Sequence, residues 1–213
     1  MVSEITLENT LPEVFSGSEN EPPVCHSQVW LRQLSFAKPQ FWLIEAESGT
    51  GKSSLCSFIY GSRTDYLGSN VRSFTIARWC ALRQRSLAYL PQEMHLFPEL
   101  TVMENIDIKN RLTGFKSRDE IRRMLDALEV GAKTDSLAGR LSVGQQQRVA
   151  IVRALCQPFD FLLIDEPVSH LDARNNAAVA AMIEAEAKSQ GAGVIATSVG
   201  NKIVLPFIKT LAL

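Results

Sequence analysis

Three features are scarce in this sequence: an excess of charge of one sign, closely spaced cysteines and long apolar runs. Twenty-two basic and 23 acidic side chains leave a net charge of −1, so no overall field draws the chain to nucleic acid or anionic lipid. The four cysteines lie far apart without CxxC spacing, which favours reduced thiols over a disulfide framework or a metal site. No run approaches the roughly 18 to 20 apolar residues of a membrane-spanning helix, and residues 1–10 lack the apolar region of a secretory signal.

Apolar side chains are plentiful enough for one large domain, at 46% of 213 residues. Continuous apolar runs at 41–44, 161–164 and 194–196 suit strands that are covered on both faces. Helical patterns separate these runs, so the sequence predicts an α/β core around a mostly parallel sheet. We expect a loop at the Pro-rich segment 16–28, a strand within 29–36, and short strands between residues 66 and 89.

Several helix ends are marked by their capping residues. Ser117 and Ser142 are each followed, three residues later, by Glu or Gln, which is the pattern of a capping box. Asp172 precedes an Ala-rich stretch that stops near Gly191. We therefore predict helices that begin after Ser117, Ser142 and Asp172.

A glycine-rich turn between the strand at 41–44 and the next helix carries the first chemical signal. Backbone N–H groups of such a turn, together with a helix N-terminus, make a site for phosphate. Lys52 can reach the β- and γ-phosphates of a nucleotide, and the Ser53 hydroxyl can take a coordination position on Mg²⁺. The candidate nucleotide ligands are Glu47, Ser48, Gly49, Thr50, Gly51, Lys52, Ser53 and Ser54.

A pair of carboxylates, Asp165 and Glu166, follows the apolar run 161–164. Open α/β sheets bind ligands at the carboxyl ends of their strands. Asp165 is the candidate Mg²⁺ ligand, directly or through water, and Glu166 the candidate that orients and polarises an attacking water. A solvated turn is the alternative interpretation, but the position of the pair, downstream of a phosphate-binding loop, disfavours it.

Residues 141–155, which read LSVGQQQRVAIVRAL, supply the most specific motif. This segment, called the signature segment below, resembles the signature motif of the ATP-binding cassette (ABC) family. Physically it is a second helix N-terminus that lacks a nucleotide of its own, so its anion must come from another phosphate-binding loop. The resemblance implies a head-to-tail dimer in which Ser142, Gly144 and Gln145 contact the ATP bound to the other subunit.

Other segments extend the resemblance over nearly the whole chain. Leu90-Pro91-Gln92 resembles the Q-loop, which makes Gln92 a ligand for Mg²⁺ or water and a sensor of the γ-phosphate. Residues 169–172 resemble the D-loop. Phe15 is the candidate for stacking on adenine, and a place in the hydrophobic core is a nearly equal alternative for this residue. The resemblance implies a single cassette domain over 1–213, with an antiparallel β subdomain and a helical subdomain at about 93–141.

Three positions depart from the family pattern. Ala46 replaces the first glycine of the loop, which costs on the order of 1 kcal/mol if the position needs a positive φ and nothing if it does not. Val143 replaces the first signature glycine. Ser198 stands where the family usually has a histidine that contacts the γ-phosphate, and loss of one such donor typically costs about 10²–10³ in rate. We therefore expect slow hydrolysis by the intact Glu166.

The resemblance implies an ATP- and Mg²⁺-dependent ATPase subunit of an ABC transporter. Such a subunit would form a homodimer, or pair with another cassette, through its signature and D-loop, and would drive a separate integral membrane subunit. It would be cytoplasmic, lie peripherally on the inner face of the cell membrane and bind no nucleic acid. Two alternatives stay open: a soluble, non-transport ABC ATPase, and a degenerate cassette that binds ATP as a regulatory switch.

Overall fold

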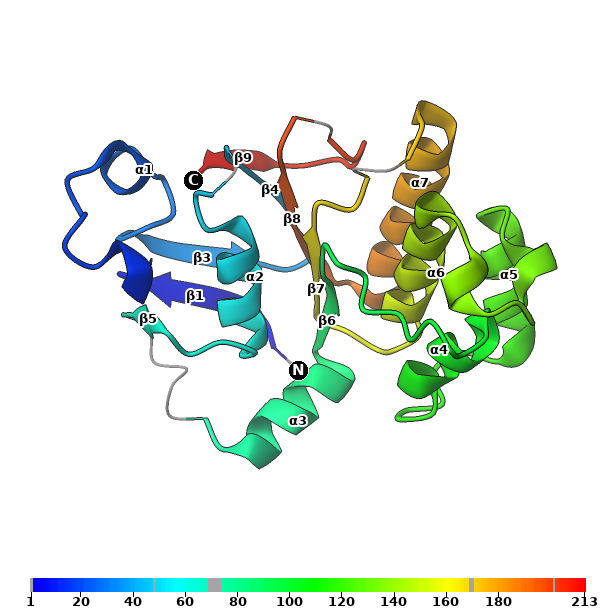
Figure 1. Cartoon of the computed structure of the whole chain (residues 1–213). Coiled ribbons are helices and arrows are strands. Elements are labelled where there is room, and N and C mark those ends of the chain that lie inside the picture. The colour runs from blue at the N-terminus through cyan, green and yellow to red at the C-terminus, as the bar shows by residue number, and fades with distance from the viewer. Residues whose placement is uncertain (1, 48, 69–73, 169–170, 201) are drawn as a thin grey trace.

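A central parallel sheet organises the computed structural model, which describes residues 2–47, 49–68, 74–168, 171–200 and 202–213. Within these residues the sheet has five strands in the order β6, β7, β8, β4 and β9 (Figure 1). Their bounds are Leu87–Leu90, Phe161–Asp165, Gly193–Ser198, Phe41–Glu45 and Lys209–Ala212. Every pairing between them is parallel. The predicted α/β fold is confirmed, and the three apolar runs form its three central strands.

Alternate side chains of the central strands enter two separate hydrophobic cores. In β7, Phe161 and Leu163 belong to one core, whereas Leu162 and Ile164 belong to the other, and all four are at most 1% exposed. This alternation follows from the two-residue period of a β-strand. Because both faces are covered, the strands read as unbroken apolar runs in the sequence.

The first face of the sheet is covered by α2 (Lys52–Tyr60) and by two small antiparallel sheets. In one of them β1 (Glu4–Glu8) pairs with β3 (Gln33–Ala37), and in the other β2 (Leu11–Pro12) pairs with β5 (Tyr66–Leu67). These strands form the left-hand lobe of Figure 1. Three short or peripheral helices join the same lobe: η1 (Glu13–Phe15), α1 (Pro22–Cys25) and α3 (Ile76–Arg85).

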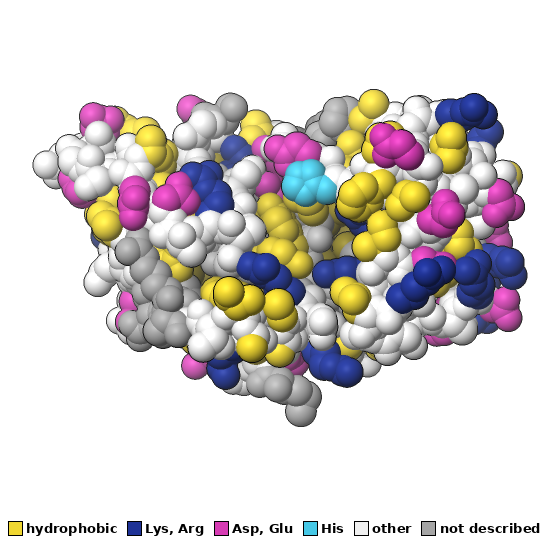
Figure 2. Space-filling view, turned by 60° about the horizontal axis from the view of Figure 1, so that its bottom comes forward, with side chains coloured by type: hydrophobic (Ala, Val, Ile, Leu, Met, Phe, Trp, Pro, Cys, Tyr) yellow, Lys and Arg dark blue, Asp and Glu magenta, His cyan; other side chains and the backbone are white. Residues whose placement is uncertain are grey.

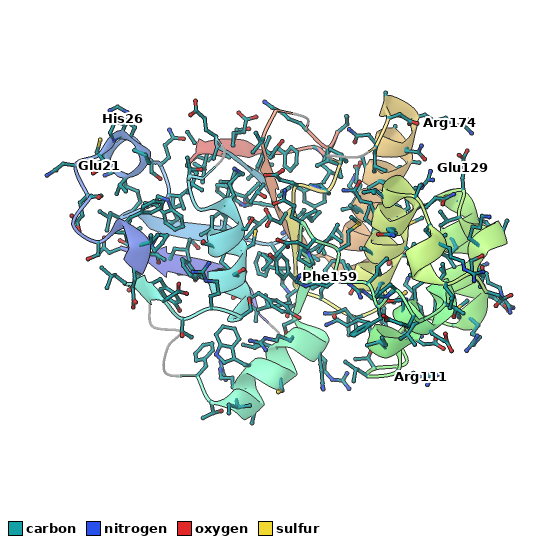
Figure 3. All side chains as sticks on the ribbon, in the orientation of Figure 1. Glu21, His26, Arg111, Glu129, Phe159 and Arg174 are labelled. Atoms are coloured by element: carbon teal, nitrogen blue, oxygen red, sulfur yellow. The ribbon has the colours of Figure 1, made fainter. Side chains whose placement is uncertain are left out.

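The second face carries the helices of the right-hand lobe (Figure 1). They are α4 (Val102–Asn110), α5 (Arg118–Ala127), α6 (Val143–Leu155) and α7 (Ala173–Gln190), with single 3₁₀ turns η3 (Gly131–Lys133) and η4 (Ala138–Arg140). Figure 3 shows Arg174 of α7 directed toward Glu129, which follows α5, and the two form an exposed ion pair. Helices α4 and α5 fall inside the stretch 93–141, whose boundaries as a subdomain stay a prediction.

The helix ends have the predicted caps. The Ser117 hydroxyl accepts a hydrogen bond from the Glu120 N–H at 3.2 Å, and the Glu120 carboxylate accepts one from the Ser117 N–H at 2.8 Å. Asp172 caps α7, which ends at Gly191 with a φ of 60°. Among the described residues, none of the helices combines the length and the apolar character that a bilayer crossing requires.

Three local expectations are confirmed only in part. Of the described residues between 66 and 89, only those of β5 and β6 form strands, and α3 lies between them, capped by Thr75. None of the α3 residues is fully buried, so their apolar pattern is weak. Segment 16–28 contains the four-residue helix α1, which is too short for periodicity to reveal. The strand expected within 29–36 begins only at Gln33, because Leu31 has a left-handed φ of 55°.

Candidate nucleotide-binding site

Four neighbouring strands deliver the predicted site residues to one edge of the sheet. The glycine-rich loop follows β4, Gln92 follows β6, Asp165 ends β7 and Ser198 ends β8. Register brings the last two together, because Asp165 pairs with Thr197 across the β7–β8 ladder. Because the strands are parallel, their carboxyl ends meet at the same edge, where open α/β sheets bind ligands.

The glycine-rich loop has the backbone of a phosphate cradle. Gly49 and Gly51 have φ values of 85° and 97°, which side chains rarely allow. Gly51 is also the N-cap of α2, so the unpaired N–H groups of that helix face the loop. The Thr50 hydroxyl donates to the Glu47 carbonyl at 2.9 Å and closes the turn. Ser48, another predicted ligand, lies outside the described residues.

A cavity of about 420 Å³, called the nucleotide cavity below, opens in front of this loop. Lys52 is only 5% exposed, and its Nζ donates to the Glu47 carbonyl at 2.7 Å. The same Nζ lies 3.8 Å from Glu166 Oε1, while Gln92 Nε2 donates to Glu166 Oε2 at 3.3 Å. Two residues predicted separately from the sequence, Lys52 and Gln92, thus meet at the carboxylate of a third, Glu166. The residues that line the cavity are Gly49, Gly51, Lys52, Ser53, Ser54, Gln92, Glu166 and Val199.

Glu166 is held in an uncommon backbone conformation. Its φ of 48° is left-handed, which costs a residue with a side chain about 1 to 3 kcal/mol. The Glu166 N–H donates to the Thr197 carbonyl at 3.3 Å, so the turn after β7 is fixed to β8. The chain direction therefore changes directly after Asp165, and Glu166 lines the nucleotide cavity.

Asp165 has the surroundings expected of a carboxylate that binds a cation. It is 1% exposed, and its Oδ1 accepts a hydrogen bond from the Thr197 hydroxyl at 2.6 Å. Its Oδ2 is buried and has no hydrogen-bond partner among the described residues, which is costly unless a positive group compensates. Ser53 and Gln92 line the adjacent cavity with further oxygen donors, the kind that Mg²⁺ prefers. These residues therefore fit Mg²⁺. Burial, and then the charge of Asp165, raises the pKa of the Cys56 thiol.

Ala46 causes no backbone strain. It is not among the described residues with a positive φ, and its N–H donates to the Ser198 carbonyl at 3.3 Å. An alanine methyl group is therefore accommodated where the family pattern has glycine, and the backbone conformation at this position adds no strain energy.

Ser198 lies at the edge of the site rather than in the nucleotide cavity. It is 4% exposed and lines a different pocket, of about 590 Å³, together with Glu47, Thr50 and other residues. Its neighbour Val199, which is 42% exposed, lines the nucleotide cavity. The C-terminal end of β8 therefore reaches both sides of the glycine-rich loop.

The signature segment does not reach the nucleotide cavity of its own chain. Ser142 and Gln145 form a capping box: the Ser142 hydroxyl accepts from the Gln145 N–H at 3.3 Å, and Gln145 Oε1 accepts from the Ser142 N–H at 3.0 Å. Val143 is 48% exposed at the start of α6. Neither these residues nor Gly144 line the cavity, and α6 lies on the opposite side of the sheet from α2 (Figure 1).

Two aromatic rings flank the glycine-rich loop, and only one of them was predicted. Phe15, at the end of η1, and Trp30 both approach Gly51, where an added β-carbon would lie 3.5 Å from Phe15 Cε2 and 2.9 Å from Trp30 Cζ2. Trp30 is fully buried, and its Nε1 donates to the Thr50 carbonyl at 3.1 Å. Sequence reasoning missed Trp30, because this contact joins residues 20 apart and has no local signature.

Taken together, a glycine-rich loop at a helix N-terminus, a buried lysine and two carboxylates at the strand ends define a P-loop nucleotide-binding protein. The family model for ABC transporters matches residues 32–169. The chain belongs to the ABC transporter family, as one of its ATP-binding cassettes. This membership confirms the resemblance drawn from the signature segment.

Individual relatives agree with this membership. The ABC transporter ATP-binding protein YtrE of Bacillus subtilis is 33% identical over 184 residues, which are 82% of this chain and 78% of that protein. The sulfate/thiosulfate import ATP-binding protein CysA of Anthoceros angustus is 40% identical over 128 residues, and the match spans only 34% of its length. Among solved structures, the ATP-binding cassette MJ0796 bound to ADP and Pi has the same fold, with a TM-score of 0.68 at 24% identity over 78% of this chain and 77% of that one.

We predict that Trp30→Phe weakens ATP binding while the chain stays folded. The substitution keeps most of the apolar ring but removes the hydrogen bond to the Thr50 carbonyl. Such a bond contributes about 0.5 to 1.5 kcal/mol, so the Kd should rise roughly 2- to 12-fold. Titration with a fluorescent ATP analogue measures this change. Trp79→Phe, at a half-buried tryptophan outside the nucleotide cavity, is the matched control. An unchanged Kd for Trp30→Phe would contradict the positioning role.

Proposed function

We propose that this chain is the ATP-hydrolysing subunit of a transporter, working as a head-to-tail dimer that drives a separate membrane subunit. One observation carries the proposal: the signature segment is a well-capped helix N-terminus that stands apart from its own nucleotide cavity. An exposed helix N-terminus attracts an anion. The phosphates bound by a second copy of the chain satisfy that requirement, and each copy then supplies what the other lacks.

Binding begins at the glycine-rich loop. The N–H groups at the start of α2 and the Lys52 ammonium group hold the β- and γ-phosphates. Lys52 already lies in the cavity, where the Glu47 carbonyl and Glu166 hold it in place. Phe15 and Trp30 flank the loop, and Phe15 supplies a ring on which adenine stacks. Ser53, Gln92 and Asp165 would hold Mg²⁺, whose charge would neutralise that of the phosphates.

Hydrolysis depends on Glu166 and Gln92. Glu166 orients and polarises the water that attacks the γ-phosphate. The hydrogen bond from Gln92 to Glu166 connects the segment after β6 to that carboxylate, so a shift of Gln92 changes the position of the reacting group. The bound phosphates displace the Lys52 ammonium group from Glu166, because the phosphates and the Glu166 carboxylate compete for it.

The dimer predicts complementation between two inactive variants. Lys52→Ala disables the P-loop, and Ser142→Asp keeps an N-cap residue but places a negative charge against the partner's phosphate. In a head-to-tail dimer, a mixture of the two regains one intact site per heterodimer, up to about a quarter of the wild-type rate if mixing is random. Phosphate release assays on the separate and mixed variants measure this. A mixture as inactive as its components would refute the arrangement.

Ser198 predicts a second outcome, a gain of activity on substitution. A serine hydroxyl does not span the distance that a histidine covers, so the chain lacks one donor to the γ-phosphate. Ser198→His is expected to raise the hydrolysis rate by at least about tenfold. Val199→His is the matched control, because it adds the same ring to the adjacent residue, whose valine already lines the cavity. If Ser198→His hydrolyses ATP no faster than the parent, the explanation for slow turnover fails.

A second cavity, of about 440 Å³, provides the contact surface for the membrane subunit. It lies between α2, the segment after β6, and helices α4 and α6, and we call it the coupling groove. Ser53 lines both this groove and the nucleotide cavity. Pro91 and Glu93 line the groove, whereas Gln92 between them lines the cavity. A segment of the membrane subunit that enters the groove therefore meets the residues on either side of Gln92, which is the hydrogen-bond partner of the Glu166 carboxylate.

The transporter role predicts a membrane-embedded partner. Glu166→Gln removes the water-activating carboxylate, so ATP holds the dimer closed and its complexes persist. From detergent-solubilised native membranes, this variant with ATP should co-purify one multi-spanning protein in near-equal amount, identified by mass spectrometry. Lys52→Ala, which cannot hold ATP, is the control. Recovery of soluble factors or nucleic acid alone would instead favour a non-transport ATPase.

A degenerate regulatory cassette is the remaining alternative, and Ser198 is the observation that favours it. The close grouping of Lys52, Gln92 and Glu166 opposes it, because a cassette that only binds ATP does not need a water-orienting carboxylate. Multiple-turnover release of phosphate by the parent chain, absent in Glu166→Gln, separates the two.

A further inference from the structure

The coupling groove contains cations that no carboxylate of the described residues contacts. Lys109 and Arg153 line the groove, and Arg83 lies directly behind Lys109, whose Nζ is 3.5 Å from the Arg83 carbonyl. Among the residues that the structure describes, none of these three cations has a carboxylate within 4.0 Å. Half-buried cations without a partner are uncommon, because removing them from water costs free energy.

Two of the three cations are already committed to backbone carbonyls. Arg153 donates to the carbonyls of Met94 and His95, the latter at 2.7 Å, and so holds the turn that follows Gln92. Arg83 donates to the carbonyls of Tyr60 and Gly61 and stacks over the Tyr60 ring at 5.1 Å. Because a carbonyl is neutral, these hydrogen bonds do not neutralise the positive charge of the two guanidinium groups.

Lys109 is the cation whose N–H donors can bind a further partner. Among the described residues, its Nζ has hydrogen bonds to the Tyr60 hydroxyl and the Arg83 carbonyl alone, both at 3.5 Å, which is the outer limit of a hydrogen bond. Burial, and then the charges of Arg153 and Arg83, lowers the pKa of Lys109. An ammonium group has three N–H donors. Lys109 can therefore donate a strong, charge-assisted hydrogen bond to a further partner without breaking its existing hydrogen bonds.

The rest of the groove suits an apolar helix or loop. Tyr60 and Tyr89 pack their rings 5.1 Å apart on its wall, and Ile108, which neighbours Lys109, is 43% exposed. Of the other charged residues on the lining, Arg63 pairs with Asp65, and Glu93 is an exposed carboxylate that lies 3.8 Å from His95, a ring that is charged only when protonated. Figure 2 shows this face of the molecule hollowed between its two lobes, with apolar side chains in the hollow and basic ones beside it.

We propose that the segment of the membrane subunit that enters this groove carries an aspartate or glutamate whose carboxylate pairs with the Lys109 ammonium group. The proposal rests on the proposed function, because it assumes that a membrane subunit docks here, and it adds the chemistry by which that subunit is recognised. Apolar side chains of the same segment cover Ile108 and the two tyrosine rings. Arg83 and Arg153 raise the positive potential at the carboxylate without contacting it. The bound carboxylate lies beside the turn that Arg153 holds, directly after Gln92.

Two crosslinking probes on the full chain, in membranes of cells that make it, test the proposal. A photoreactive benzoylphenylalanine at Ile108 reports whatever occupies the groove. A water-soluble carbodiimide joins an amine to a carboxylate only when the two are in contact, so it reports a carboxylate at Lys109. Peptides crosslinked by either probe are identified by mass spectrometry. We expect both probes to capture the same loop of one multi-spanning protein, with an amide between Lys109 and an Asp or Glu of that loop.

Variants of Lys109 supply the controls. Lys109→Arg keeps the charge but not the reactive amine, so the carbodiimide product disappears while the photocrosslink stays. Lys109→Met removes the charge and should reduce the photocrosslink about tenfold or more, as loss of one member of a desolvated charge pair does. Lys133→Arg, at an exposed lysine of η3 outside the groove, should change neither.

The outcomes separate this proposal from the proposed function. A membrane-protein loop captured at Ile108, without a carboxylate joined to Lys109, overturns the ion pair and leaves the transporter role standing. A photocrosslink that Lys109→Met does not reduce does the same. Capture of a second copy of this chain, nucleic acid or lipid at Ile108, or of nothing at either position, overturns the docking proposal. In that case the Glu166→Gln co-purification decides separately whether a membrane subunit exists.

Discussion

The parallel pairing of β4, β7 and β8 is the constraint on which the rest of the structure depends. These strands are buried on both faces, and their register places Glu45 beside Ser198 and Asp165 beside Thr197. Parallel strands need long crossover connections, and these connections become the helices that cover the sheet. The same direction of the strands brings the glycine-rich loop, the two carboxylates and the end of β8 to one edge. Fold and site therefore have a common cause.

Electrostatic competition around Glu166 gives this edge its chemistry. A buried lysine, a glutamine and a strained backbone turn all converge on one carboxylate, while one oxygen of the neighbouring Asp165 has no hydrogen-bond partner within the described part of the chain. Buried polar groups are costly when partly satisfied, so such a site is stable only because the sheet and α2 hold it rigidly. In the proposed mechanism, the phosphates and Mg²⁺ would complete the set of partners, and their binding would reorganise the contacts around Glu166.

The nucleotide cavity and the coupling groove share the start of α2 and the segment around Gln92. Arg153 of α6 fixes this segment through carbonyls of Met94 and His95, both of which have left-handed φ values. A contact in the groove would therefore act on the same short stretch of backbone that contacts Glu166. The positive charge of Lys109 gives the groove a chemical preference as well as a shape, so the proposed partner contact and the proposed catalytic carboxylate lie within a few residues of each other.

Short-range signals in the sequence determined much of this protein. The glycine-rich loop, the carboxylate pair and the signature segment are contiguous, so their residue types and spacing identified the family and most candidate site residues, and capping pairs such as Ser117 and Glu120 identified helix starts. Tertiary structure decided what depends on contacts between distant segments: α3 formed where strands were expected, Trp30 reached the Thr50 carbonyl, Val199 reached the cavity that Ser198 does not line, and Lys109 came to lie against the Arg83 carbonyl. Local sequence carries no record of such contacts, because they arise only when the sheet brings remote side chains together.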